Sequence, residues 1–361
     1  MLQKLLSALY STRLMALLFI GFAAAMAAGT FIEDAYNTET ARILVYNTWW
    51  FEAIMVFFVI NFFGNIKRYQ LYKKEKWATL LLHLSFIFII IGAFVTRYIS
   101  YEGLMPIREG AISNTVYSDM PHLTTFVDGE YQGEMKRKTI ENQLLLSQAV
   151  NNSFSYSDKF SDIPYKIELQ EFIMNASQTF KPNAKGDLYI KLVEASGGSR
   201  KEHFLRDGEV KNISNVLFAF NKFTQGAVNI SKIAEAYTIQ TPFDGNFMRM
   251  ADKFQGTISK DKASPLMFRS LYNAGGSQFV FPELAQNGEV VLASNNDYKD
   301  KKTDDAIVVK VTSQNKEEIV TLTGSKGKQG EPKSFKIGKL DFTLMYGSKV
   351  HTLPFSIKLD D

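Results

Sequence analysis

The sequence predicts a membrane α-helical region of three transmembrane helices, followed by a mainly antiparallel β extracytoplasmic domain. The apolar residues of the 361-residue chain are concentrated in the first hundred positions, where they form long runs. From Tyr101 onward, short alternating stretches are separated by Gly, Asn and Pro, which is typical of strands and turns. The mean hydropathy of -0.10 therefore averages over two different regions, residues 1–100 and 101–361.

Three apolar runs are long enough to cross a membrane, since a spanning helix needs about 20 predominantly apolar residues. They cover residues 14–32, 44–66 and 77–96. The first run, with its basic start and small residues, also fits a cleavable signal peptide. A membrane helix is favoured, because two more spans follow and because Gly29 and the neighbouring alanines suit close helix packing.

The distribution of basic residues predicts how these helices are oriented. The short loop between the second and third runs carries Lys67, Arg68, Lys73, Lys74 and Lys76. Loops rich in Lys and Arg stay in the cytoplasm, and the basic N-terminus agrees with that side. We therefore expect everything after the third run to lie outside the cytoplasm.

His83 is the ionisable residue inside the third run. At 1.5 Å per residue it lies about 9 Å along the helix from Trp77, below the headgroups. An ionisable side chain at that depth is costly unless it faces a partner helix, a cavity or a ligand. Two interpretations stay open: ligand or proton chemistry, or a hydrogen bond to a neighbouring helix.

The second run has polar and aromatic residues near its outer end. Trp49 and Trp50 are expected to anchor the helix at the interface. Glu52 could reach the interface by leaning outward, or it could pair with a cation or a cofactor edge inside the bundle. The first alternative is favoured.

The region after Tyr101 contains stretches with strand-like alternation. The expected strands are 165–172, 188–193, 227–230, 278–281, 307–312, 318–323, 335–337, 340–346 and 350–359. Short helices are expected at 140–150 and 265–272. The last five strands are joined by short connections, which predict an antiparallel meander, and the glycine-rich stretch 324–330 is interpreted as a hairpin loop.

Composition excludes several functions. The chain has no cysteine, which excludes disulfides, iron–sulfur clusters and thiol chemistry. Its 41 basic and 37 acidic residues are too balanced for a nucleic-acid-binding surface. His122, His203 and His351 lack the spacing of metal ligands and are expected to be surface or turn histidines.

Particular motifs carry a resemblance to a known family. The third run reads HLSFIFIIIGAFVTRY, is followed by GLMPIREG, and the β-region ends in HTLPFSIKLDD. With three spans and a basic second loop, the chain resembles the ResB/CcsB family of System II cytochrome c biogenesis. It looks like the N-terminal part of a fused CcsB-CcsA type protein, and the resemblance covers nearly the whole chain.

The resemblance implies a function in the bacterial cytoplasmic membrane, with a cytoplasmic N-terminus and a periplasmic C-terminal domain. Family members move haem b across the membrane, keep its iron reduced and present it to apocytochrome c. The family's transmembrane haem-ligating histidine corresponds to His83. Thr79, Leu80, Phe86, Ile87 and Ile90 share its helix face, so they form either one wall of a haem slot or ordinary helix packing.

The resemblance also implies partners and missing parts. The partners are a CcsA-like WWD-domain protein or fused C-terminal half, apocytochrome c, and a thioredoxin-like reductant of the apocytochrome. The sequence stops at Asp361, where the family has a fourth helix, and it lacks the WWD segment and external histidines. The chain is therefore interpreted as a fragment, truncated at its C-terminus. It is not an enzyme by itself but part of a holocytochrome c synthase whose attachment residues lie elsewhere.

Two other functions remain as alternatives. One is a membrane-anchored β-domain that binds a protein or an envelope polymer, in which His83 is structural. The other is a quinone-coupled or proton-coupled redox subunit that uses His83 and Glu52 as a relay. A haem absorption spectrum with and without His83 distinguishes these from haem transport.

Overall fold

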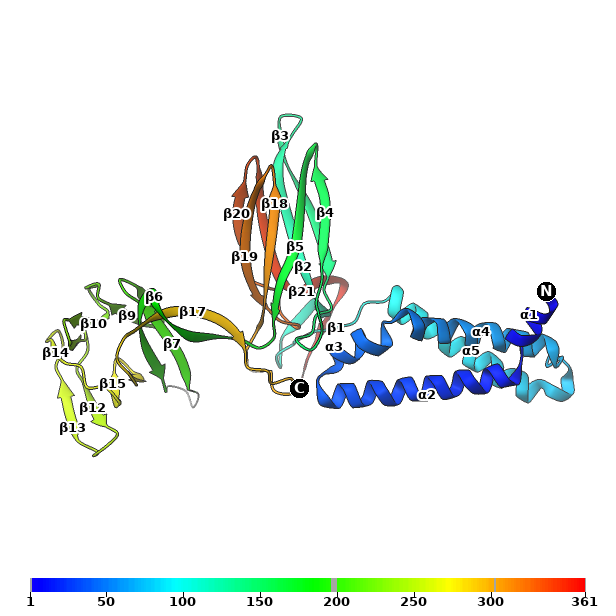
Figure 1. Ribbon diagram of the computed structural model, residues 1–361, viewed down its shortest axis with the longest axis horizontal. Helices are drawn as coiled ribbons and strands as arrows, with labels where there is room; N and C mark the ends of the chain where they lie inside the picture. The colour runs from blue at the N-terminus through cyan, green and yellow to red at the C-terminus, as the bar shows by residue number, and fades with distance from the viewer. Residues whose placement is uncertain (1, 196–199, 302, 361) are drawn as a thin grey trace. The chain divides into compact units, whose positions relative to one another are not determined.

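The computed structural model describes residues 2–195, 200–301 and 303–360, and it has the predicted fold class (Figure 1). Three helices in this part of the chain are long and apolar enough to cross a membrane, and a mostly antiparallel β-region follows. The chain divides into two compact units. The first runs to Ala176 and resumes at Ser294, and the second comprises Ser177–Ala293. The second unit is thus inserted into the β-region of the first.

The helices of the first unit begin with the short α1 (Leu2–Leu9) and the long α2 (Thr12–Ala35), which is capped where Ser11 Oγ accepts from Leu14 N at 3.1 Å. The other long helices are α4 (Trp49–Arg68) and α5 (Trp77–Tyr98), with the short 3₁₀ turn η2 (Lys74–Lys76) between them.

The second span starts later than the predicted residue 44. Residues 38–46 instead form a helical turn, α3 (Thr38–Ala41), and a π-helical turn, η1 (Arg42–Tyr46). Thr48 then adopts an extended backbone, and its Oγ1 donates to Val45 O at 2.6 Å. A side chain that bonds the preceding turn in this way competes with helix continuation, so α4 begins only at Trp49.

The long helices pack through large apolar side chains. Leu18 of α2, Phe58 and Phe62 of α4, and Ile87 of α5 form one buried cluster. Gly29 lies against Tyr46, since a Cβ built at this glycine would be 2.2 Å from Tyr46 Oη. This agrees with the expectation that Gly29 permits close packing.

The first unit also contains a sandwich of two sheets. One sheet has the strand order β1–β2–β21–β20, with β3 pairing with β2, and the other has the order β19–β18–β5–β4. The strands of the first sheet are β1 (Gly103–Leu104), β2 (Ile112–Tyr131), β3 (Glu134–Gln143), β20 (Lys333–Ile337) and β21 (Leu340–Lys358). Those of the second are β4 (Ser155–Phe160), β5 (Ile163–Ile173), β18 (Asp305–Ser313) and β19 (Lys316–Gly324).

Alternation along the strands creates the core between these sheets. Every second residue of β21 from Leu340 to Tyr346 is buried, and so are Ile307, Val309 and Val311 of β18. Tyr165 of β5 meets Phe342 of β21 edge to face across the sandwich, with ring centroids 5.7 Å apart. Burial of such side chains is worth about 1.5–3 kcal/mol each, which holds the two sheets together.

The second unit has two further sheets. The first has the order β13–β12–β15–β16–β6–β17, with β7 beside β6, and the second has the order β14–β11–β10–β9–β8, in which β9 and β10 run parallel. Phe218, Phe220, Tyr272, Phe279 and Phe281 form the centre of its core. The strands are β6 (Ala176–Glu194), β7 (Lys201–Arg206), β8 (Val210–Ile213), β9 (Val216–Phe220), β10 (Val228–Ile233), β11 (Ala236–Gln240), β12 (Gly245–Arg249), β13 (Gln255–Ile258), β14 (Ser264–Pro265), β15 (Ser270–Ala274), β16 (Ser277–Val280) and β17 (Gln286–Ser294).

The two expected short helices are wrong. Residues 140–143 end strand β3, where Ile140 pairs with Thr125, and residues 144–150 form an irregular segment. Residues 265–272 contain a strand end, a turn and the start of β15, with Arg269 at a φ of +55°. In both stretches, pairing with a distant strand overrides the local helical preference.

The expected meander is correct only in part. The connections β18–β19 and β20–β21 are antiparallel hairpins. Residues 324–330 are not a hairpin loop, because β19 and β20 belong to different sheets and the stretch crosses between them. Residues 347–348 are not a turn but lie inside the continuous strand β21, where a register shift with β2 takes up the irregularity.

A local ion pair on the sandwich surface gives a pH-dependent prediction. Lys138 Nζ lies 2.5 Å from Asp158 Oδ2 and Tyr156 donates to the same oxygen, and these contacts lower the pKa of Asp158 to about 2. A carboxyl with a lowered folded pKa stabilises above its unfolded pKa and loses this contribution as pH falls toward 2.

We therefore expect Asp158→Asn to lower the free energy of unfolding by about 0.5–1 kcal/mol at pH 7, since the pair is partly exposed. The difference from wild type should shrink below pH 4 in urea titrations. Asp162→Asn, at an exposed turn, is the control. A difference that does not change between pH 7 and pH 3 would contradict the role of the charge.

Candidate functional site

His83 lies in the second turn of α5 and is half-buried. Its Nδ1 is 2.9 Å from the carbonyl oxygen of Thr79, one turn earlier. A carbonyl can only accept a hydrogen bond, so Nδ1 is the donor, and in the neutral ring Nε2 then keeps its lone pair. The ring meets Phe62 of α4 edge-on, with centroids 5.6 Å apart. Nε2 has no hydrogen-bond partner in the described part of the chain.

The residues predicted around His83 lie mostly on the same side of α5. Phe86 stacks on Phe62 with centroids 5.4 Å apart, Ile87 is 3% exposed, and Ile90 contacts the same apolar cluster. The helical spacing 83, 86, 87 and 90 explains this shared face. Thr79 is exposed and supplies its carbonyl to His83. The structure thus shows helix packing here, and a haem-contacting role of these side chains stays a prediction.

The rest of the α5 surface is open. Apolar side chains are exposed along it over several turns, namely Leu81, Leu82, Phe88, Ile89, Ile91, Phe94 and Val95. A helix that is apolar all round and little buried by its own chain is suited to lipid or to a further membrane segment. His83 therefore lies at the border between the packed side and the open side of α5.

Glu52 pairs with a cation instead of leaning freely outward. Its Oε1 accepts from Arg97 and, at 2.9 Å, from Tyr98 at the far end of α5, and Arg97 also donates to Tyr46 O at 2.6 Å. Of the two alternatives, pairing with a cation is the one that the structure contains, and a position of Glu52 at the interface stays a prediction. His83 and Arg97 are 14 residues apart, about 21 Å along the helix, so the two polar groups form separate sites.

The three remaining histidines lie on strands and not in turns. His122 is half-buried, its Nδ1 donates to Met120 O at 2.8 Å, and burial lowers its pKa. His203 lies 3.3 Å from Glu194, and burial again lowers its pKa. His351 stacks on Tyr101 with ring centroids 4.1 Å apart. Within the described residues, no group of three or more His, Asp or Glu side chains is arranged to hold a metal ion.

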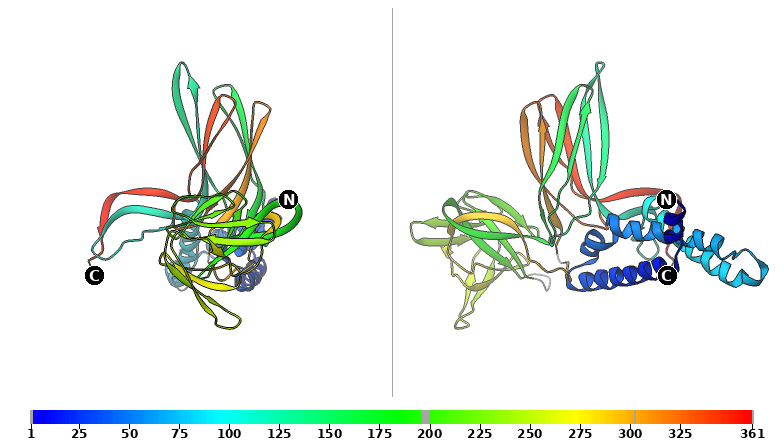
Figure 2. Two further views of the ribbon diagram at one scale, coloured as in Figure 1. Left: turned by 90° about the vertical axis from the view of Figure 1, so that its left-hand side faces the viewer. Right: turned by 45° about the vertical axis from the view of Figure 1, so that its right-hand side comes forward.

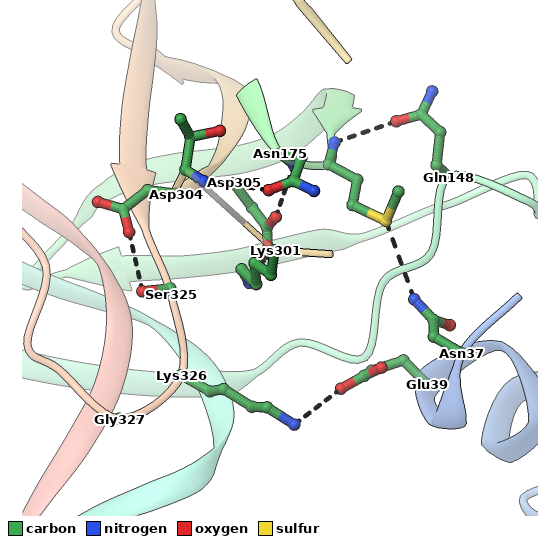
Figure 3. A network of polar contacts seen from close by, with 12 residues as sticks. Asn37, Glu39, Gln148, Asn175, Lys301, Asp304, Asp305, Ser325, Lys326 and Gly327 are labelled. Atoms are coloured by element: carbon green, nitrogen blue, oxygen red, sulfur yellow. Dashed lines mark hydrogen bonds and ion pairs between the residues drawn. The ribbon is translucent and has the colours of Figure 1, made fainter. Parts of the chain in front are cut away.

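A cavity of about 180 Å³ lies where the segment after α2 meets the base of the sandwich. Figure 3 shows the polar network beside it, in which Lys326 pairs with Glu39 at 3.3 Å and Asn37 Nδ2 approaches Met174 Sδ at 3.9 Å. Lys301 pairs with Asp305 at 2.6 Å. Because these charges are paired within the protein, the network joins the helical region to the sandwich.

Sequence reasoning missed this joint. Its partners are 77 to 287 residues apart in the chain, and no local pattern connects them. A buried hydrogen bond of 2.6 Å joins the hydroxyl groups of Thr40 and Ser147, and Arg42 Nη1 lies 3.4 Å from Asp119 Oδ2. The only available signal was that the loop 33–42 is rich in polar residues although it is short.

Comparison with known proteins gives a partial match. No protein-family description matches the chain. Over 123 residues the sequence is 41% identical to Protein NrfI of Wolinella succinogenes. The chain is homologous to part of NrfI. The matched stretch makes up 34% of this chain and only 13% of NrfI, so the activity of that whole protein does not transfer directly to this chain.

Proposed function

We propose that this protein is a haem-handling component of cytochrome c maturation in the bacterial cytoplasmic membrane. In this proposal it helps to move haem across the membrane, keeps the iron reduced and presents haem to apocytochrome c. The support comes from the family-like motifs around α5 and at the end of β21, from the homology to part of NrfI, and from the three candidate membrane spans.

The observation that carries the proposal is the state of His83. Histidines that bind metal commonly donate their second ring N–H to a carbonyl or carboxylate, which fixes the ring and its tautomer. The bond from Nδ1 to Thr79 O has this form and leaves the Nε2 lone pair available. Neutral imidazole is also the form that costs least at this depth in a membrane.

The residues fit one side of a haem, which is the cargo in this proposal. His83 would supply one axial nitrogen, and apolar side chains on the open surface of α5 would exclude water from the ring. The space toward α4 is filled by Phe62 and Phe86, so haem would bind on the open side. Other segments or partner proteins then contribute the second ligand of the haem iron. They also supply the CcsA-like WWD segment and the reductant of apocytochrome c.

The alternative redox relay has less support. Glu52 is held by Arg97 and Tyr98 at the far end of α5, and Arg97 lies about 21 Å along the helix from His83, so a direct proton transfer between His83 and Glu52 has no short path. The alternative of a purely structural His83 is consistent with the bond to Thr79, because such a bond also satisfies an imidazole in an apolar helix. It predicts that the protein binds no haem through this residue.

The deciding experiment is the absorption spectrum of haem that co-purifies with the full chain. The chain is expressed together with the partner segment that supplies the second haem ligand. Haem with a histidine-ligated spectrum in wild type, lost on changing His83, supports the proposal. Equal haem content in both proteins would overturn the ligand assignment.

The proposal requires a defined orientation, which cysteine labelling can test. The chain has no cysteine of its own, so Lys74→Cys and Lys185→Cys provide single reporters. A membrane-impermeant maleimide should label position 185 in intact spheroplasts, and position 74 only after lysis, because the basic loop stays in the cytoplasm. Labelling of position 74 in intact spheroplasts would reverse the topology. The neighbouring position Gly186 is unsuitable for a cysteine reporter, since a Cβ there would be 2.2 Å from Gly288 O.

A further inference from the structure

A two-stranded ribbon extends from the sandwich at its membrane-facing end. It consists of residues 112–117 of β2 paired with residues 350–358 of β21, and β1 pairs along its base. Figure 2 shows this ribbon leaving the body of the sandwich, with the C-terminal end of the chain at its tip. The tip is ordered by backbone bonds, since Gly110 N donates to Leu359 O at 2.8 Å and Leu359 N to Ala111 O at 3.1 Å.

The base of the ribbon lies close to the end of a membrane span. Four residues separate Tyr98 at the end of α5 from Gly103 in β1, so these two positions are at most about 18 Å apart. Tyr101, in this connection, stacks on His351 of β21, and Asp119 N bonds Glu102 O at 2.9 Å.

A second contact ties the base of the ribbon to the helices. Arg42, in the π-helical turn before α4, lies 3.4 Å from Asp119 and donates to Met120 Sδ at 3.2 Å. The ribbon therefore starts beside the ends of two candidate spans, α4 and α5. Being tied at both points, it cannot move far from those helix ends.

The ribbon exposes apolar side chains that the sandwich does not cover. Phe355 is 57% exposed, Ile357 is 44% exposed, and Leu104 and Leu359 are also exposed. Ile112 is exposed too, but it pairs with Lys358 and therefore lies on the opposite face from Ile357. Exposed apolar residues begin earlier, at Tyr98, Ile99 and Tyr101, so the apolar surface continues from α5 into the ribbon. Such a continuous exposed patch marks a contact with a membrane or a partner.

An irregularity in β21 explains how this patch arises. Ser113 pairs with Ile357 and Thr115 with Thr352, so two steps along β2 correspond to five along β21. The extra residues form a bulge that contains Pro354 and Phe355. Proline has no backbone N–H to donate, so it is tolerated at a bulge, where the hydrogen bonds of the ladder are interrupted. The bulge also takes Phe355 out of regular pairing.

We propose that this ribbon is a membrane-surface anchor that inserts Phe355 and Ile357 into the interfacial layer of the bilayer, on the side where α5 ends. The occupant of the patch is lipid, because the patch continues the lipid-facing surface of a spanning helix. Arg108, just before the ribbon, and Lys358, which pairs with Asp360 at 2.6 Å, would then lie near the lipid headgroups. The anchor would fix the sandwich against the membrane independently of haem.

Spin-label accessibility tests this anchor in the full chain reconstituted into vesicles. Single cysteines replace Phe355 and Ile357, and Met135→Cys is the matched control, because Met135 is an equally apolar and 67% exposed residue in β3 of the same sheet. Nitroxides at 355 and 357 should show a several-fold higher ratio of oxygen to water-soluble nickel-chelate accessibility than the nitroxide at 135. Circular dichroism checks that each variant keeps its β-structure.

Two outcomes would overturn the proposal. Nickel accessibility at 355 and 357 equal to that at 135 would place the ribbon in water. Shielding from both oxygen and nickel would show that protein, such as a second copy or another segment, covers the patch. A further variant carries Phe355→Ser and Ile357→Ser together with a nitroxide at position 359. The oxygen-to-nickel accessibility ratio at 359 should fall to that of the nitroxide at 135. An unchanged ratio at 359 would also contradict the assignment.

Discussion

Replacing His83 with Ala should lower the amount of haem that co-purifies with the full protein by at least about tenfold. Even the loss of a residue that only supports a metal ligand typically lowers metal affinity by about 10–100-fold, so the loss of the ligand itself should cost at least as much. The change removes the imidazole that we assign as an axial ligand. It leaves α5 an apolar run of spanning length, so the helix should still insert. Haem that remains should oxidise faster, because an open axial position admits water or oxygen. Optical spectra under reducing and oxidising conditions measure both effects.

A matched control separates ligand loss from damage to the helix. Ser85→Ala removes another side chain of α5 that bonds a carbonyl one turn earlier, with Ser85 Oγ 2.8 Å from Leu81 O. It should leave haem content unchanged. Added imidazole should restore part of the haem to the His83→Ala protein, since the small ring fits the space left by the deleted side chain.

A structural histidine predicts a different pattern. The yield of folded protein would fall, haem per folded molecule would stay constant, and imidazole would have no effect. If His83→Ala carries normal, stably reduced haem and still supports cytochrome c maturation, the ligand assignment is wrong.

The comparison of sequence and structure shows which features are local. The third span is visible in the sequence because a run of twenty predominantly apolar residues permits few other structures, and the structure places α5 within two residues of the prediction. Strand β18 was also predicted, because its β-branched run alternates with polar residues from Val309 onward, where Lys310 and Thr312 separate the apolar positions. In both cases one short stretch contains the whole signal.

Strand β2 shows why other features were missed. It spans Ile112–Tyr131 but contains Ser118, Asp119 and Pro121, which break the alternation. Pairing with both β21 and β3 determines this strand, and those partners are remote in the sequence. The division into two units was likewise hidden, because β6 and β17 enter and leave the second unit without a linker rich in Gly or Pro.

The candidate site follows the same rule. His83 was found because a single ionisable residue in an apolar run is conspicuous. Its contact with Phe62 depends on α4, and no pattern within α5 reports it. The pairing of Glu52 with Arg97 joins residues 45 apart, so the sequence could suggest a cation as a partner but not identify which one.

The glycine-rich stretch 324–330 provides the second large expected effect. Gly330 lies against the backbone of β21, and a Cβ built there would be 1.9 Å from Tyr346 O. Gly324 makes the same approach, with a Cβ 1.8 Å from that oxygen. Tyr346 pairs with Leu123 of β2, and its side chain is buried, so the strand cannot move aside easily. An added methyl group must therefore displace the loop.

We expect Gly330→Ala to cost about 1–3 kcal/mol, as overpacking against fixed structure typically does. For a unit of this size that corresponds to a fall in melting temperature of about 2–12 °C, followed by far-UV circular dichroism. Gln329→Ala is the matched control, because it changes the neighbouring exposed position and should stay within about 0.5 kcal/mol of wild type. Gly324→Ala should reproduce the loss.

The same substitution should also weaken the joint between helices and sandwich. Lys326, in the displaced loop, pairs with Glu39, and Lys328 pairs with Asp304 at 2.6 Å. Loss of these contacts should make the segment after α2 more sensitive to limited proteolysis in Gly330→Ala than in Gln329→Ala. If Gly330→Ala melts at the wild-type temperature and is cleaved no faster, the loop does not lie against Tyr346, and the glycines at 324 and 330 serve only as flexible connectors.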